Sequence, residues 1–139
     1  MSRRTRTWRC ERGQALVEFA LVIPVLLVMI VGLVEFARAW NTQQVLTDVA
    51  REALRNSVVA NREFTYAAMR NIVDQGLIRA SLDPSLAQVT VEGWKTGTGT
   101  PARIRIDYPY DMGVFSNVIG WATGDGTLAL STSFVMRNE

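Results

Sequence analysis

The feature that most constrains how this chain can fold is an apolar run near its N-terminus. Residues 15–34 read ALVEFALVIPVLLVMIVGLV, which is 20 residues with one charged side chain, Glu18. At a rise of about 1.5 Å per residue, a helix of this length crosses a hydrocarbon layer of about 30 Å. The run exceeds the about 7 to 15 residues typical of a secretory signal core, and no small-residue cleavage site follows it. The sequence therefore predicts a retained transmembrane helix.

The basic residues of the chain are concentrated before this run. Of 15 Lys and Arg, five precede Gly13 and are opposed there by one glutamate, so removing residues 1–13 would leave 10 basic and 12 acidic residues. By the positive-inside rule, this bias places the N-terminus in the cytoplasm and the residues after about Trp40 outside. Clustered arginines also bind nucleic acid, but their position directly before the apolar run favours a role in topology. We therefore expect no nucleic-acid partner.

We expect three regions in the chain: a basic cytoplasmic leader (1–13), a transmembrane helix (14–38) and an extracytoplasmic α+β domain (39–139). Apolar residues continue at helical spacing from Trp40 through Val58, so the first helix should extend as an amphipathic helix to about Val59. This apolar stripe should pack against a sheet.

The remaining elements follow from periodicity and turn residues. A second amphipathic helix is predicted over 62–77, with Asn61 as a possible cap and Gly76 or Pro84 at its end. Apolar and polar residues alternate over 87–94, 103–110 and 127–137, which predicts three strands, and a short helix is expected within 114–119. The fold class predicted is α+β and pilin-like, with a long N-terminal transmembrane and amphipathic helix, a second helix and a small antiparallel sheet of about three strands.

The composition argues against the commoner kinds of catalytic site. The chain has no histidine and one cysteine, Cys10, which removes the usual zinc sites, the histidine-based catalytic triads and any internal disulfide. Carboxylates such as Asp107 and Asp111 have no spacing that marks a site. We expect no cofactor, no metal, no small-molecule substrate and no enzymatic activity; a membrane-bound enzyme is the hypothesis with the least support.

Glu18 is the anomalous residue of the apolar run. An isolated carboxylate within a membrane helix costs a few kcal/mol and is by default a functional candidate. If the chain were cut between Gly13 and Gln14, Glu18 would be the fifth residue of the mature protein, near the positive end of the helix dipole. A freed α-amine on an adjacent subunit would then supply an opposite charge. The alternative is that Glu18 reaches back to the lipid headgroups, and this residue alone does not decide between the two.

The residues around Glu18 resemble a known processing site. The string RGQALVEF, residues 12–19, resembles the site of type IV-type prepilins, in which a short basic leader ends in Gly and Glu is the fifth mature residue. Phe19 after Glu18 looks like the Glu-Phe or Glu-Tyr pair of tight-adherence (Flp/Tad) prepilins. The stretch from about Glu11 to Ala60 is similar to the TadE-like minor pseudopilins of that system. The chain departs from conventional type IV pilins because it would begin with Gln14 rather than Phe and lacks C-terminal cysteines.

This resemblance implies a structural role. A prepilin peptidase of the inner membrane would cut after Gly13, which makes Gly13 and Gln14 the processing residues and Glu18 and Phe19 the assembly residues. The implied partners are the inner membrane, that peptidase, other pilins and pseudopilins and the Tad assembly machinery. The implied function is that of a minor pseudopilin in the assembly of a Flp-type pilus for adhesion or secretion, in the filament or in the basal complex. The alternative is an uncleaved single-pass membrane protein whose outer domain binds an envelope or secreted partner.

Overall fold

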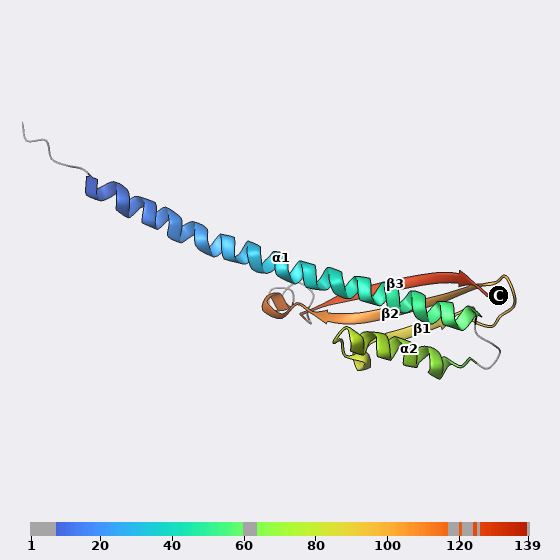
Figure 1. Cartoon of the computed structure of the whole chain (residues 1–139). Helices are drawn as coiled ribbons and strands as arrows, with labels where there is room; N and C mark the ends of the chain where they lie inside the picture. Colours follow the sequence, from blue (N-terminus) through green and yellow to red (C-terminus); the bar gives the residue numbers. More distant parts are fainter. Residues whose placement is uncertain (1–7, 60–63, 117–119, 121–123, 125, 139) are drawn as a thin grey trace, which may run out of the picture. The chain divides into compact units, whose positions relative to one another are not determined.

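The computed structural model describes residues 8–59, 64–116, 120, 124 and 126–138 (Figure 1). The chain divides into two units, Met1–Phe36 and Ala37–Glu139. Helix α1 (Trp8–Val59) contributes residues to both units, and every other helix and strand of the described chain belongs to the second. The predicted end of the first helix at about Val59 is confirmed.

The first unit contains the apolar part of α1. Most large apolar side chains between Leu16 and Val34 keep 46–69% of their surface exposed, while Ile23 and Val31 are less exposed. The core helix of a water-soluble protein buries such residues, whereas the most apolar window of α1 has none of its residues buried. By length and composition, α1 is long and apolar enough to cross a membrane, as the sequence predicted.

The second unit is built on the following part of α1. Its buried residues recur three and four positions apart, which puts them on one side of the helix. Those in the apolar core are Leu46, Val49, Ala50, Ala53, Leu54 and Val58, and Ala39, Thr42 and Ser57 are buried as well. Trp40, which we expected to begin this stripe, is 58% exposed. At about 100° per residue it lies about 120° around the helix from Leu46, outside the buried stripe.

Helix α2 (Tyr66–Arg79) starts four residues later than predicted. Its N-cap is Thr65, whose Oγ1 accepts a hydrogen bond from the backbone N–H of Ala68 at 3.2 Å. The predicted cap, Asn61, lies outside the described residues. The helix runs past Gly76 and ends before the 3-10 helix η1 (Pro84–Leu86), so neither Gly76 nor Pro84 ends it directly.

The sheet has three antiparallel strands in the order β1-β2-β3. Strand β1 (Gln88–Glu92) is shorter than predicted, β2 (Pro101–Asp111) is slightly longer, and β3 (Thr127–Arg137) has the predicted bounds. In the register, Ile106 pairs with Val89 and Ile104 pairs with Phe134. The predicted short helix within 114–119 corresponds in part to the 3-10 helix η2 (Gly113–Phe115), and residues 117–119 lie outside the described part.

The core of the second unit lies between the helices and one face of the sheet. Along β2, Ala102, Ile104, Ile106 and Tyr108 are buried, while alternate residues point to the other face. The core joins these side chains to the buried residues of α1 and to Met69, Val73 and Leu77 of α2, and α1 and α2 lie along the sheet in Figure 1. The α+β, pilin-like fold class is therefore confirmed.

Candidate processing and assembly site

The four residues singled out from the sequence lie close together on α1. Gln14 and Glu18 are one helical turn apart, and Gln14 Nε2 donates a hydrogen bond to Glu18 Oε1 at 3.1 Å. Both side chains are exposed, and Phe19 is also exposed. The side chain that contacts Glu18 is thus a neutral amide, at the start of an apolar segment.

Gly13 is a helical glycine for which the fold gives no reason. A Cβ added there would meet no heavy atom within 4 Å, and its φ is not in the left-handed region. Glycine inside a helix costs about 1 kcal/mol relative to alanine. Since neither space nor backbone conformation requires glycine here, any requirement for it comes from outside the folded chain.

The sequence could have revealed the bond between Gln14 and Glu18, because amide and carboxylate side chains four residues apart on a helix are neighbours.

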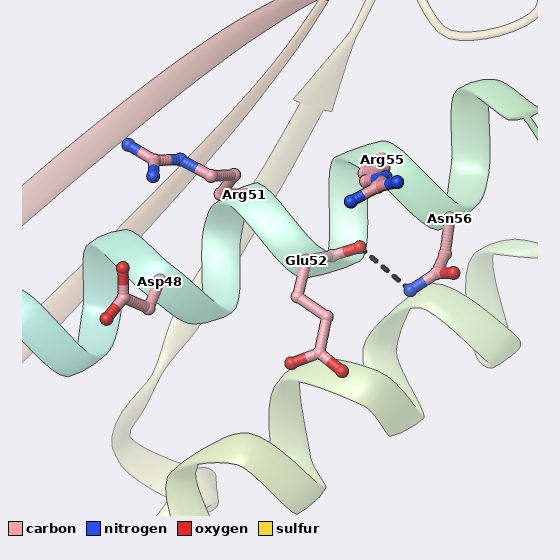
Figure 2. A pocket seen from close by; sticks show the side chains of 5 residues that line it. All are labelled: Asp48, Arg51, Glu52, Arg55 and Asn56. Carbon is pink, nitrogen blue, oxygen red and sulfur yellow. Dashed lines mark hydrogen bonds between the residues drawn. The ribbon is translucent and has the colours of Figure 1, made fainter.

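A second group of charged residues lies on α1 within the second unit, and the sequence indicated it only as the polar side of an amphipathic helix. Asp48, Arg51, Glu52, Arg55 and Asn56 line an open depression on α1 within the second unit (Figure 2). Arg51 lies over the ring of Phe134 from β3, 5.1 Å from its centroid, and Glu52 Oε2 is 3.3 Å from Nη2 of Arg79 from α2.

The two carboxylates whose spacing marked no site, Asp107 and Asp111, have local partners. Arg105 Nε lies 2.9 Å from Asp107 Oδ2 on the uncovered face of the sheet. Hydrogen bonds from Arg105, followed by one from Ser131, lower the pKa of Asp107, so its carboxyl is ionised at neutral pH. Asp111 Oδ1 accepts a hydrogen bond from the backbone N–H of Gly113 at 2.9 Å, which shapes the turn after β2. In the described part of the chain, no three His, Cys, Asp or Glu side chains are grouped to hold a metal ion.

These features define a class of protein: a small α+β module that follows an exposed apolar helix of membrane-spanning length, with one carboxylate near the start of the apolar segment. Residues 13–55 match the model of a family described as TadE-like protein. The chain thus carries a TadE-like segment, and the resemblance noted from the sequence is confirmed over these residues. No match was found among curated proteins or among solved structures.

The matched segment includes all four candidate residues, Gly13, Gln14, Glu18 and Phe19, and continues along α1 to Arg55. It therefore covers the apolar run and most of the helical stripe that packs on the sheet. The strands lie beyond the matched residues, so their description rests on the structure alone.

Proposed function

We propose that this protein is a minor pseudopilin of a Tad system that takes part in the assembly of a Flp-type pilus used for adhesion or secretion. In this proposal α1 anchors the chain in the bacterial inner membrane with its N-terminus in the cytoplasm. A prepilin peptidase removes residues 1–13, and other pilin-like subunits and the Tad machinery are its partners. The observation that carries the proposal is the exposed acidic residue Glu18 at the start of an exposed apolar helix, within the TadE-like segment.

The exposure of the apolar segment supports anchoring. A soluble protein rarely exposes a contiguous apolar patch larger than a few hundred Å², whereas α1 exposes large aliphatic and aromatic side chains along its length from Leu16 to Val34. A lipid bilayer covers such a helix. The excess of arginine before Gly13 supports retention of the N-terminus in the cytoplasm.

The surroundings of Gly13 support cleavage. Glycine at this position contributes nothing to the fold, while a peptidase whose site closes around the backbone selects a residue without a side chain. After cleavage Gln14 would carry a free α-amine one turn from Glu18. The new helix end would have a positive dipole and unpaired N–H groups, which favour a nearby carboxylate.

The function we assign to Glu18 is attraction between subunits. In lipid, a carboxylate near the mature N-terminus of one chain is stabilised by the α-amine of a neighbouring chain, and the loss of one partner leaves the other charge uncompensated. This pairing selects the axial position of an incoming subunit. Phe19, exposed beside Glu18, adds apolar contact at the same level.

Substitution of Glu18 tests the proposal. In cells whose only copy is the variant, Glu18→Ala should remain in the membrane fraction, because removing the charge favours insertion by a few kcal/mol, but piliation should fall strongly. Glu18→Asp keeps the charge on a shorter side chain and should restore part of the piliation. Electron microscopy of pili and fractionation of membranes measure the two effects separately. Normal piliation with Glu18→Ala would overturn the role of this residue.

A further inference from the structure

The outward face of α1 in the second unit carries its charges in two rows. Asp48 and Glu52 form an acidic row, and Arg51 and Arg55 form a basic row; all four residues are exposed. At about 100° per residue, the members of each row lie about 40° apart around the helix, and the rows adjoin each other. Figure 2 shows Arg51 on the side of α1 towards the sheet and Glu52 on the side towards α2.

Contacts with the neighbouring elements draw one residue of each row to opposite sides of this face. On one side the Arg51 guanidinium rests over Phe134 of β3, and on the other Glu52 pairs with Arg79 of α2. The side chains of Arg79 and Glu52 are 63% and 50% exposed, so this pair stays accessible to solvent. The face therefore presents separated negative and positive charge to any surface that approaches it.

We propose that this face binds the same face of a second copy of the chain, with the two helices parallel. A two-fold axis parallel to the helices places the acidic row of each copy opposite the basic row of the other. The rise of about 1.5 Å per residue puts Arg51 between Asp48 and Glu52 along the axis. Arg51 of each copy then falls between the two carboxylates of the other, without any axial shift. An antiparallel pair, related by a two-fold axis across the helices, would place acidic rows against each other.

Membrane anchoring agrees with the parallel arrangement, and this step rests on the proposed function. Residues 37–59 follow the apolar segment directly, so two copies anchored in one membrane enter the contact from the same end. Exposed ion pairs contribute little stability, so the contact is weak by itself. Its charges select the orientation of the partner more than they set the affinity. Confinement to one membrane raises the effective concentration of the second copy.

Disulfide cross-linking of the full chain in membranes tests the proposal. Gln44 is exposed one turn before Asp48 on the same face, and Gln44→Cys in a Cys10→Ser background should give a cross-linked dimer. Asp48→Arg with Glu52→Arg makes both rows basic, and Arg51→Glu with Arg55→Glu makes both acidic. Each double variant alone should lose about tenfold or more of the dimer. Co-expression of the two should restore a mixed dimer, and the chain that carries all four reversals should again cross-link with itself.

The charge reversals also remove the contacts with Phe134 and Arg79, so a loss of cross-linking could come from loss of structure. Recovery of cross-linking in the mixed pair and in the fourfold reversal shows instead that charge pairing was lost. Equal cross-linking in every combination, or no cross-linking of the parent chain, would overturn the proposal. So would failure of the mixed pair and of the fourfold reversal while circular dichroism shows folded protein. The cross-link does not depend on cleavage after Gly13. The same measurement in Gly13→Leu therefore distinguishes failure of this contact from failure of the proposed processing.

Discussion

Two helical glycines show how differently the same residue can be required. A Cβ at Gly76 would lie 2.5 Å from Cγ2 of Val49, whereas a Cβ at Gly13 would meet nothing within 4 Å. Gly76 lets α2 approach α1 closely, so the fold requires it. Gly13 has no such role, which directs attention to an external agent such as a peptidase.

Gly13→Leu should therefore separate folding from processing. The exposed helix has room for the side chain and leucine favours helix over glycine by about 1 kcal/mol, so membrane insertion should be unchanged. Cleavage should fall sharply because the peptidase would meet a large side chain. Intact mass of the purified chain measures the cleaved fraction, and complete cleavage of Gly13→Leu would contradict the role of Gly13.

Gly76→Ala should destabilise the second unit by about 1–3 kcal/mol, because the added methyl group overlaps Val49 in a packed contact. Val49→Ala should restore part of this stability in the double variant, although it opens a cavity when made alone. Chemical denaturation in detergent, followed by circular dichroism, measures both effects. Additive losses would show that the two residues do not compete for the same space.

Asp107 should make the stability of the fold depend on pH in the acid range. Hydrogen bonds from Arg105 lower the pKa of Asp107 below its unfolded value of about 3.9. The stabilisation is therefore complete above about pH 4 and is lost as the pH falls through the lower, folded pKa. Asp107→Asn should flatten the acid limb of stability against pH, and Arg105→Gln should flatten it similarly. An acid limb that neither substitution changes would contradict this assignment.

At the scale of elements, α2 connects the helical layer to the segment leading into β1. Arg70 donates from Nη1 to the carbonyl of Ala87 at 2.9 Å and from Nη2 to that of Pro84 at 2.8 Å. Its Nε lies 2.8 Å from Asp74 Oδ1. The hydroxyl of Tyr66 donates to the carbonyl of Val89 at 3.1 Å. Side chains of α2 thus satisfy backbone groups along and before β1.

Arg70→Ala and Arg79→Ala form a matched pair for this role. Arg70→Ala should cost about 2–3 kcal/mol because two carbonyls lose a charged donor, whereas Arg79→Ala removes only an exposed ion pair worth about 0–1 kcal/mol. Thermal unfolding of both variants in the same detergent compares the losses. Equal losses would show that the bonds of Arg70 do not tie α2 to β1.

Local patterns predicted some element boundaries and missed others for physical reasons. The bounds of β3 followed from strict alternation after a turn, and the end of α1 followed from its apolar spacing. The start of α2 was wrong because Asn61 and Thr65 both suit an N-cap, and a single sequence does not choose between them. Gly76 was taken as a stop signal because its contact with Val49 is not local. The contact of Arg51 with Phe134 was missed for the same reason.

At the scale of the whole molecule, the candidate site and the charged face of α1 differ in how far the sequence alone could reveal them. The residues of the candidate site were chosen from the motif in residues 12–19, which lies on one helix, and their roles in processing and assembly stay predictions. The TadE-like match includes this site and ends at Arg55. The charged face of α1 could not be predicted from a local motif, since the side of the helix that stays exposed depends on which sides β3 and α2 cover.

The N-terminus of the membrane-embedded chain tests the central claim most directly. Intact mass and N-terminal sequencing should be compared in cells with and without the matching prepilin peptidase. We predict a chain that begins at Gln14 when the peptidase is present and keeps residues 1–13 when it is absent. A chain that keeps its arginine-rich leader in both strains would contradict the pseudopilin account and favour an uncleaved single-pass protein that binds a partner through its outer domain.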